Sequence, residues 1–335
     1  MTPNKNLLTD DFGRTHNYLR ISLIEKCNLR CTYCMPADGI ALSPKADLMT
    51  AQEIYAIAKT FVHHGVNKIR LTGGEPLLRK DFPEIITQLA SLGTEISITT
   101  NGILVDRYLD VLKANKVTKI NLSLDTLVAT KFNAITLRNQ FQCVIDNLHL
   151  LLNNGFQVKV NVVLIKGFNE NEIIDFIHLT QHLPLAIRFI EFMPFAGNDW
   201  DRTKMVSQQE ILEQVHAAFG KTEVEKLQDD KNFTSRDFKI KNYLGSFGII
   251  SSITNPFCDG CNRIRLTANG KIKNCLFSNH ETDLLTAYRS GQALETVIAT
   301  AIQTKMKVRA GMTSIEEIND PVLHQDNRSM ISIGG

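Results

Sequence analysis

Three cysteines near the N-terminus have the type and spacing to hold a metal cluster. Cys27, Cys31 and Cys34 follow an extended apolar stretch with the spacing C-x3-C-x2-C. Thiolates bind iron–sulfur clusters well, and a complete all-cysteine shell needs four of them. Three neighbouring ligands without a fourth therefore predict a cubane cluster with one open iron. The same spacing is also one face of a helix, but the stop at Met35-Pro36 disfavours a long buried helix.

A second cysteine group lies in the C-terminal third of the chain. Cys258 and Cys261 are followed by Cys275 after thirteen residues, again three cysteines rather than four. A zinc ribbon requires two C-x2-C pairs or histidines at matching spacing, and the nearest histidine, His280, lies five residues beyond Cys275. Zinc with this histidine stays an alternative, but a second cluster with one open iron fits the spacing better.

Two arginines follow this second group. Arg263 and Arg265 point the same way if their segment is extended, so we expect two guanidinium groups beside the second cluster. The remaining cysteine, Cys143, stands alone in a helical stretch and is predicted to pack in the core.

The elements that must position these residues alternate regularly over the first 220 residues. Strands are predicted at 18–24, 68–72, 95–99, 119–124, 157–165 and 186–193. Each is followed by a helical stretch, and capping boxes mark the helices that begin after Thr50 and Ser207. Six such units predict a parallel α/β fold, an incomplete (βα)6 TIM-type barrel.

The alternation stops after Gly220, which divides the chain into two predicted domains. Residues 1–220 form the partial barrel. Residues 221–335 carry the second cysteine group, a helical stretch at 281–318 and a polar tail that ends in Gly334-Gly335. This C-terminal segment is expected to close the open side of the barrel.

Polar residues share one face of every predicted strand, whereas strands of a parallel sheet covered by helices usually are apolar throughout. The shared faces hold Arg20 and Ser22; Lys68, Arg70 and Thr72; Ser97 and Thr99; Asn121, Ser123 and Asp125; Lys159 and Asn161; and Glu191 and Met193. The opposite faces are mostly apolar and should lie under the helices. We therefore expect a lumen that holds a polar ligand.

Four of the lumen residues are cations without matching acids: Arg20, Lys68, Arg70 and Lys159. Buried cations require counter-charges, so these residues predict a multiply anionic ligand, with polyphosphate as the obvious candidate. The alternative, strand residues that face solvent, is credible for one lysine but not for the whole set.

The overall composition excludes several classes of protein. A hydrophobic fraction of 43%, a charged fraction of 21% and a net charge of +2 are those of an ordinary globular protein and give no reason to expect nucleic acid or a membrane as the main partner. No apolar stretch resembles a membrane span or a signal peptide. Seven cysteines without an export signal favour a reducing compartment, so a cytoplasmic location is predicted.

Several motifs resemble those of one known family. CNLRCTYCMP resembles the signature loop of radical S-adenosylmethionine enzymes, and Gly73-Gly74-Glu75-Pro76 resembles their glycine-rich turn. The order of LTGGEPLLR, TTNG, SLD, VKVNVV, RFIEFM, PFCDGCNRIRLTANGKIKNCLF and the final diglycine is similar to that of the GTP 3′,8-cyclase family, which catalyses the first step of molybdenum cofactor biosynthesis.

The resemblance implies cofactors and a set of binding residues. It implies two [4Fe-4S] clusters, one on Cys27, Cys31 and Cys34, with S-adenosylmethionine on its open iron, and one on Cys258, Cys261 and Cys275, next to the guanine of GTP. The implied contacts of S-adenosylmethionine are Tyr33, Gly74, Ser123 and Met193. The implied contacts of GTP are Arg20, Lys68, Arg70, Thr99, Lys159, Arg263, Ile264 and Arg265. Among these, Arg20, Arg263 and Arg265 are implied to be catalytic. The preference for Thr99 over Thr100 rests on strand phase and on the alignment of the motif.

The resemblance also implies a reaction and partners. A 5′-deoxyadenosyl radical would remove the hydrogen from C3′ of the ribose, and C3′ would attack guanine C8 to give (8S)-3′,8-cyclo-7,8-dihydroguanosine 5′-triphosphate. The implied partners are an electron donor such as flavodoxin or ferredoxin, the cyclic pyranopterin monophosphate synthase that receives the product, and a second copy of the chain in a homodimer. The Gly334-Gly335 tail would enter the site.

Two other functions remain open at this point. One is a radical enzyme that acts on a peptide and uses the second cysteine group for an auxiliary cluster. It predicts an acidic or apolar groove instead of a cationic lumen. The other is a zinc-stabilised binding protein without enzymatic activity.

Overall fold

The computed structural model describes residues 6–35, 39–229, 231, 232 and 234–334. Pro36 of the first cysteine loop and Gly335 of the tail lie outside the described residues. In the described part of the chain, no helix is long and apolar enough to cross a membrane.

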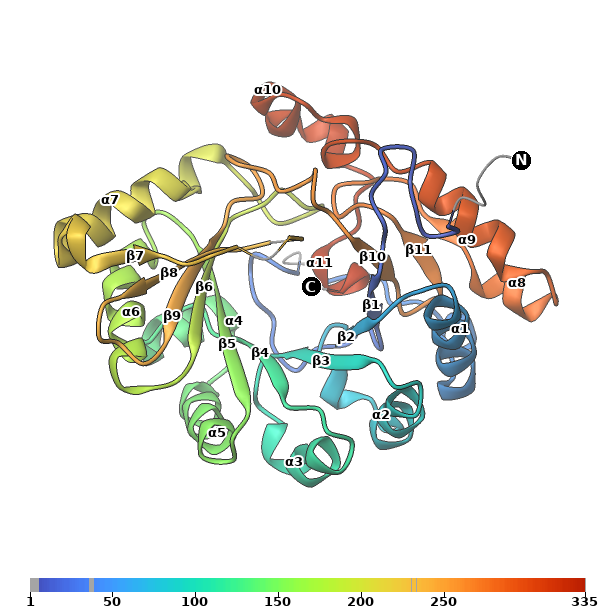
Figure 1. The fold of residues 1–335 in the computed structure, drawn as a ribbon, viewed down its shortest axis with the longest axis horizontal. Helices are drawn as coiled ribbons and strands as arrows, with labels where there is room; N and C mark the ends of the chain where they lie inside the picture. The colour runs from blue at the N-terminus through green and yellow to red at the C-terminus, as the bar shows by residue number, and fades with distance from the viewer. Residues whose placement is uncertain (1–5, 36–38, 230, 233, 335) are drawn as a thin grey trace.

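One curved sheet runs through the molecule, and its centre is parallel (Figure 1). Its strand order is β12-β11-β10-β1-β2-β3-β4-β5-β6-β9-β8-β7. The central strands are β1 (Tyr18–Ser22), β2 (Lys68–Thr72), β3 (Glu95–Thr100), β4 (Lys119–Ser123), β5 (Gln157–Leu164) and β6 (Ala186–Glu191). Each of them pairs in parallel with the next. The predicted parallel α/β architecture is therefore confirmed.

Helices cover the outer side of this sheet (Figure 1). They are α1 (Ala51–His63), α2 (Phe82–Ala90), α3 (Val105–Ala114), α4 (Ala129–Thr136), α5 (Phe141–Asn153), α6 (Ile173–His182) and α7 (Gln208–Phe219). Both predicted capping boxes are present, at Thr50 with Glu53 and at Ser207 with Glu210. The short helix α4 was not predicted, because the sequence before α5 lacks a capping signal.

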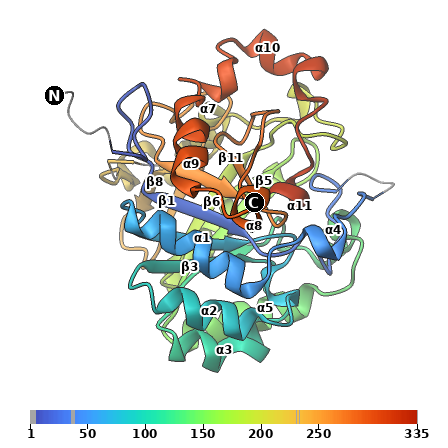
Figure 2. The same cartoon turned by 90° about the vertical axis from the view of Figure 1, so that its right-hand side faces the viewer.

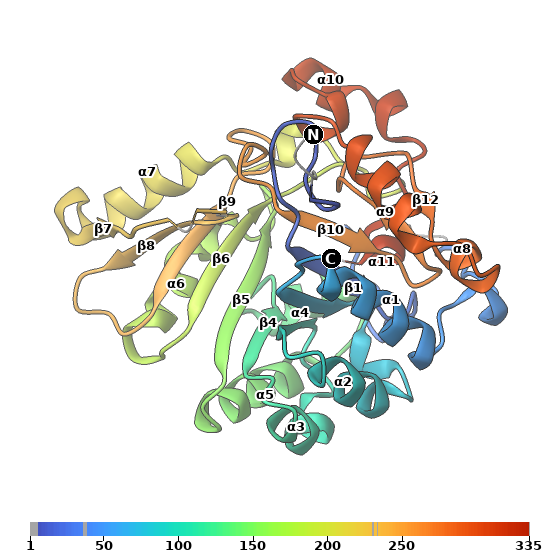
Figure 3. The same cartoon turned by 45° about the vertical axis from the view of Figure 1, so that its right-hand side comes forward.

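The C-terminal part adds strands to both ends of the same sheet (Figure 3). On one side, β9 (Ser246–Ile250) pairs in parallel with β6 and leads to β8 (Arg236–Ile240) and β7 (Val224–Lys226). On the other side, β10 (Arg263–Leu266) pairs in parallel with β1 and leads to β11 (Lys271–Lys273) and β12 (Thr282–Asp283). Residues from both halves therefore meet across the inner face.

The last part of the chain is only partly helical. It contains α8 (Leu285–Arg289), α9 (Leu294–Gln303), α10 (Ile315–Asn319) and α11 (Met330–Ile333). The prediction of a helical stretch at 281–318 is thus correct for three separate helices and wrong at β12. Figure 2 shows α9 beside α1 on the outer side of the molecule, whereas α11 lies on the inner side of the sheet in Figure 1.

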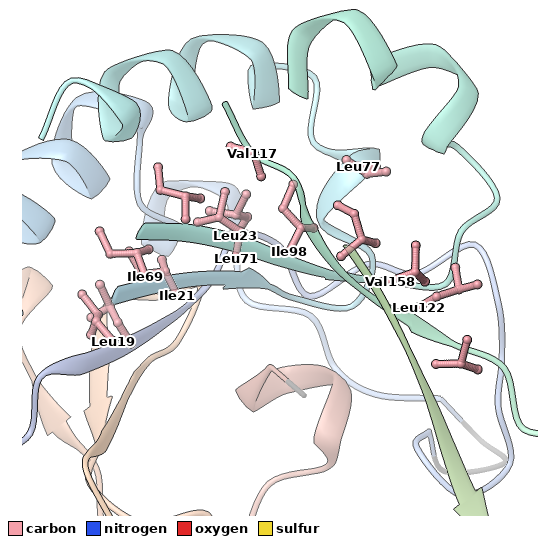
Figure 4. Packing of buried hydrophobic residues seen from close by; sticks show 14 of the residues in the cluster. Leu19, Ile21, Leu23, Ile69, Leu71, Leu77, Ile98, Val117, Leu122 and Val158 are labelled. Carbon is pink, nitrogen blue, oxygen red and sulfur yellow. The ribbon is translucent and has the colours of Figure 1, made fainter. Parts of the chain in front are cut away.

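The apolar faces of the strands form the core under the helices (Figure 4). Leu19 and Ile21 of β1, Ile69 and Leu71 of β2 and Ile98 of β3 are fully buried. Burial of each such side chain contributes about 1.5–3 kcal/mol to folding. Because side chains alternate along a strand, the residues between them face the opposite, inner side. This alternation is what brings the predicted polar faces together.

The predicted face of the sixth strand is wrong at Glu191, whereas Met193 does line the cavity. In β6 the inner side carries Arg188 and Ile190, whereas Glu191 is fully buried on the outer side. The Glu191 carboxylate accepts hydrogen bonds from the backbone N–H groups of Ile253 (2.8 Å) and Thr254 (3.0 Å). The polarity of Glu191 is explained by these hydrogen bonds and therefore does not indicate that the residue faces the lumen.

Candidate active site

A cavity of about 530 Å³ lies on the inner face of the sheet, between the central strands and the C-terminal segment. It brings together most of the residues that the sequence singled out. Its wall includes Arg20, Lys68, Arg70, Thr99, Lys159, Met193, Cys258, Cys261, Arg263, Arg265 and Cys275. Thr100, the neighbour of Thr99, instead donates its hydroxyl to Glu75 Oε1 at 2.8 Å.

Strand register places three arginines in one row across the cavity wall. Arg265 of β10 lies opposite Arg20 of β1, which lies opposite Arg70 of β2. Burial, reinforced by the neighbouring guanidinium groups, lowers the pKa of Arg20 to about 10 and that of Arg265 well below its ordinary value. A row of buried cations that repel one another is a site for an anion.

The aromatic ring of Tyr18 lies within this cationic group. The charged groups of Arg20, Lys68 and Arg70 lie 5.5, 5.2 and 5.4 Å from its ring centroid. Cations at this distance are attracted by the face of an aromatic ring. Tyr18 shares the β1 face of Arg20, so strand phase could have identified it.

The cavity is not free of acids, which corrects one prediction. Lys68 pairs with Glu95, with 2.8 Å between Nζ and Oε1, and Asp237 also lies in the wall. The cations still outnumber these acids, because Arg188, Lys273, Lys305 and Arg309 join the predicted set.

Several buried polar atoms of the wall have no hydrogen-bond partner within the described residues. They include Arg20 Nε, Asn161 Oδ1, Ser235 Oγ and Arg263 Nη2. A buried donor or acceptor without a partner is costly, so such atoms are usually satisfied by a ligand or by water. The guanidinium donors of Arg20 and Arg263 fit an anionic ligand. The acceptor Asn161 Oδ1 fits a ligand that also carries a hydrogen-bond donor.

The second cysteine group lies in the wall of this cavity. Cys258, Cys261 and Cys275 are free and partly buried. Burial alone would raise the pKa of Cys261, but the charges of Arg263 and Lys305 bring it down to about 6. Thiolates stabilised by adjacent cations fit an anionic iron–sulfur cluster.

The histidine that the zinc alternative requires does not lie at this site. No three histidine, cysteine or carboxylate side chains in the described ranges are close enough to hold a single metal ion. His280 is exposed and lies outside the cavity wall.

The first cysteine loop leaves the end of β1 and packs against the glycine-rich turn after β2. Gly74 donates its N–H to Ile24 O at 2.7 Å, and Glu75 donates its N–H to Lys26 O at 2.9 Å. A Cβ on Gly74 would lie 2.3 Å from the oxygen of Lys26, so only glycine permits this approach. The turn thereby fixes the segment that leads into Cys27.

The thiols of this loop lie in a different electrostatic environment from Cys261. Burial raises the pKa of Cys27 to about 11 and that of Cys34 to about 12, and it raises the pKa of Cys31 well above its ordinary value. The charges of the three thiolates would also act on one another. These sulfurs require a cationic group to become thiolates, which fits metal binding with release of protons.

Two of the four residues expected to contact S-adenosylmethionine lie in or against this loop, namely Tyr33 and Gly74. The Tyr33 hydroxyl donates to Asp125 Oδ2 at 2.8 Å, and Asp125 Oδ1 accepts the backbone N–H of Val163 at 2.8 Å. Ser123 ends β4, two residues before Asp125. Of the four residues, Met193 lines the cavity.

The C-terminal tail lies between the two cysteine groups. The Arg265 guanidinium donates to the carbonyl oxygen of Gly334, and a Cβ on Gly334 would meet the side chains of Thr72 and Ser22. The Ile331 N–H lies against the sulfur of Cys34. The tail is therefore packed inside the molecule as far as Gly334.

One expected contact residue lies elsewhere. The side chain of Ile264 is fully buried in the hydrophobic core and does not line the cavity. Its strand neighbours Arg263 and Arg265 face inward, so alternation turns Ile264 outward. Only its backbone could contact a ligand.

The sequence missed the contribution of residues 234–237. Thr234, Ser235 and Asp237 line the cavity, and Thr234 accepts a hydrogen bond from Arg263 Nη1. These residues carry no motif and reach the site through the pairing of β8 with β9 and of β9 with β6. Arg188, by contrast, could have been found from the period of β6.

Comparison with known proteins agrees with these features. Residues 21–180 match the radical SAM superfamily, and residues 185–311 match Molybdenum Cofactor Synthesis C. The mitochondrial GTP 3′,8-cyclase of Arabidopsis thaliana is 44% identical over 339 residues, which cover 99% of this chain and 85% of that protein. The chain belongs to the GTP 3′,8-cyclase family.

Other members of this family are longer, and more distant structures share the fold. Molybdenum cofactor biosynthesis protein 1 of Bos taurus is 46% identical over 337 residues, and the chain spans about half (52%) of its length. The crystal structure of Streptococcus suis SuiB bound to S-adenosylmethionine has a TM-score of 0.59 at 17% identity and covers 81% of this chain and 65% of that one. This likeness concerns the fold, and it fits a partial TIM barrel.

Proposed function

We propose that the chain converts GTP into (8S)-3′,8-cyclo-7,8-dihydroguanosine 5′-triphosphate, the first step of molybdenum cofactor biosynthesis. The family supports this reaction. The observation that carries it is the row of Arg265, Arg20 and Arg70 in the same cavity as the second cysteine group. A triphosphate and a base attached to it need such a pair of neighbouring sites.

The proposed cofactors are S-adenosylmethionine and two [4Fe-4S] clusters. Cys27, Cys31 and Cys34 would hold one cluster, with S-adenosylmethionine bound by Tyr33, Gly74, Ser123 and Met193. Cys258, Cys261 and Cys275 would hold the other. When bound, these groups supply the chemistry that removes a hydrogen atom from the ribose. The chain itself contributes orientation of the substrate and exclusion of water.

The cations of the cavity would bind the triphosphate. Lys68, Lys159 and Arg188 lie with the arginine row on the inner faces of β1, β2, β5 and β6, and Thr99 of β3 adds a hydroxyl. Charge-assisted hydrogen bonds to phosphate oxygens are among the strongest in proteins. With the triphosphate bound in this way, the ribose would lie between the two cysteine groups.

The second half of the cavity would hold the guanine. Arg263 and Arg265 would contact the base or the ribose, together with the backbone of Ile264. The Arg263 guanidinium already lies 4.6 Å from the ring centroid of Phe257 and beside Cys261, so its position is defined before the substrate arrives. We assign catalytic roles to Arg20, Arg263 and Arg265.

The division of the chain follows from this scheme. Residues 1–220 would form the partial barrel of six βα units with the first cluster. Residues 221–335 would close its open side with the second cluster and the tail, including Gly335 beyond the described residues. Four further points stay predictions: an electron donor such as flavodoxin or ferredoxin, transfer of the product to cyclic pyranopterin monophosphate synthase, a homodimer and a cytoplasmic location.

Anaerobic incubation with GTP, S-adenosylmethionine and dithionite tests the proposal. We expect formation of 5′-deoxyadenosine to rise with added GTP, and Arg265→Ala to abolish this rise. Arg289→Ala is the control, because Arg289 lies on α8 and binds Glu53 outside the cavity. If 5′-deoxyadenosine does not depend on GTP, the proposal is wrong. Zinc without acid-labile sulfide in the purified protein would also contradict it.

The competing function on a peptide is not favoured. It predicts an acidic or apolar groove, whereas the wall of the cavity is lined by arginines and lysines.

A further inference from the structure

Asn101, which follows β3, has no role in the scheme above. It is nevertheless buried, and both its backbone and its side chain form hydrogen bonds. Its side chain is 8% exposed. It belongs to the TTNG segment, whose Thr99 faces the cavity and whose Thr100 binds Glu75. The Asn101 backbone N–H donates to Glu75 Oε2 at 2.7 Å. The glycine-rich turn therefore fixes the position of this residue.

The orientation of the Asn101 side-chain amide is also determined. Its Oδ1 accepts the backbone N–H of Ile103 at 3.1 Å. Oxygen and nitrogen of an amide are assigned from such hydrogen bonds, and an N–H donor requires the oxygen at this position. The Nδ2 group must therefore point the other way, towards the first cysteine loop.

Two acceptors in that loop face Nδ2. Asn28 Oδ1 lies 2.7 Å away, and Cys27 Sγ lies 3.6 Å away. An amide NH₂ has two hydrogens, which matches these two acceptors. Cys27 Sγ also accepts the backbone N–H of Leu29 at 3.4 Å. Asn101 thus supplies a side-chain donor from another part of the chain to a proposed cluster ligand.

The residue that fixes Asn101, Glu75, accepts several hydrogen bonds. Besides Asn101, the Glu75 carboxylate accepts the N–H of Leu77 at 3.1 Å and the hydroxyl of Thr100 at 2.8 Å, and it is fully buried. One carboxylate therefore connects the glycine-rich turn, the end of β3 and, through Asn101, the cysteine loop. Rigid second partners of this kind orient ligands and tune the bound group.

We propose that Asn101 is a positioning residue that donates a hydrogen bond to the sulfur of Cys27 and thereby raises the reduction potential of the first cluster. A cluster gains negative charge on reduction, and N–H donors to its sulfurs stabilise that charge. The environment makes this donor important, since the groups that act on the three thiols include the carboxylates of Glu75 and Asp125 and the other thiolates. This inference rests on the proposed binding of a cluster by Cys27, Cys31 and Cys34.

The test is a redox titration of the full, cluster-loaded chain, followed by electron paramagnetic resonance. The first cluster is recognised by the change of its signal when S-adenosylmethionine is added. We expect Asn101→Ala to lower the equilibrium constant for one-electron reduction about tenfold, which is 59 mV towards more negative potential. Asn101→Asp keeps the size and the acceptor but adds a negative charge, so its shift should be larger.

Asn147→Ala is the matched control. The Asn147 side chain is also a buried amide in the same region, and it donates to Gly102 O at 2.7 Å and to Ile103 O at 3.3 Å. It supports the loop after Asn101 but no proposed cluster ligand. We expect its removal to cost stability and to leave the potential unchanged. An equal shift in this control, or no shift in Asn101→Ala, would overturn the inference.

The unaltered chain gives a second readout that does not depend on the loading of a variant. With asparagine labelled with ¹⁵N in the side-chain amide, the reduced first cluster should show hyperfine coupling to this nitrogen. Absence of the coupling contradicts the inference. If the unaltered chain lacks the S-adenosylmethionine-sensitive signal altogether, the proposed function fails instead.

Discussion

Single side chains in the cavity carry charge in places where burial makes charge costly. Lys159 is the plainest case. Burial, reinforced by Arg188, Arg70 and Lys68, lowers its pKa from 10.5 to about 8, although Asp237 acts in the opposite direction. Between these two values the unfolded chain holds the proton and the folded chain does not. The free energy of unfolding should therefore rise with pH in this window.

A triphosphate should reverse this loss of charge. Since the anion favours protonated Lys159, GTP binding at pH 8 should take up about half a proton at this residue, and the affinity should fall as pH rises above 8. Titration calorimetry in buffers of different ionisation enthalpy measures this uptake. Lys159→Met should bind GTP more weakly and lose that part of the uptake. Uptake that is unchanged in Lys159→Met would assign the proton to another group.

The inner face of the sheet could be predicted from the sequence because side chains alternate along a strand. Arg20, Arg70, Thr99 and Lys159 all lie where strand phase puts them. The choice of the inner face was wrong at Glu191 of β6, because this acidic residue lies on the outer side and accepts hydrogen bonds from the backbone of Ile253 and Thr254. Polarity indicates a lumen only when no local partner explains it.

Residues 234–237 could not be predicted to reach the site. Thr234 and Asp237 come to the cavity through pairing between strands that are distant in the sequence. Lys305 enters the wall just beyond α9 and donates to Arg263 O at 3.1 Å. No short motif marks such contacts, because they depend on the register of the whole sheet.

At the scale of elements, the glycine-rich turn packs against the backbone of the cysteine loop without room for a side chain. Gly74→Ala would place a methyl group 2.3 Å from Lys26 O, and backbone cannot yield as a flexible side chain does. We expect the cysteine loop to be displaced and the iron and sulfide content to fall to that of the second cysteine group alone.

Gly93→Ala is the control for this substitution. Gly93 has a φ of +70°, but a Cβ there meets nothing within 4 Å. It should cost about 1 kcal/mol of stability and leave the iron content unchanged. Full iron content in Gly74→Ala would show that the loop tolerates a larger separation from the turn.

The tail is fastened by Arg328, which precedes α11. Its Nε lies 2.9 Å from Glu281 Oε1, and its Nη1 lies 3.7 Å from Glu25 Oε1. Glu25 comes two residues before Cys27, and Glu281 follows the second cysteine group. One guanidinium therefore connects the tail to both halves of the site.

Loss of this guanidinium should loosen the tail. We expect Arg328→Ala to reduce stability by about 1 kcal/mol and to speed hydrogen exchange at the Ile331 amide, which lies against Cys34. Arg289→Ala, which removes an exposed arginine bound to Glu53, should leave this exchange unchanged. Unchanged exchange in Arg328→Ala would mean that packing alone holds α11.

At the scale of the whole molecule, the sheet joins both halves of the chain around one cavity. The central strands and the C-terminal part both supply cations to the cavity wall, and β10 and its neighbouring loops supply the second cysteine group. Neither half has a complete site by itself. The central claim is that this arrangement directs a radical to the ribose of GTP.

Transfer of deuterium tests this claim most directly. The loaded protein is incubated anaerobically with S-adenosylmethionine, dithionite and GTP that carries deuterium at ribose C3′, and the 5′-deoxyadenosine is analysed by mass spectrometry. We predict that each 5′-deoxyadenosine formed in the first turnover carries one deuterium. Unlabelled 5′-deoxyadenosine, formed equally with and without GTP, would contradict the account.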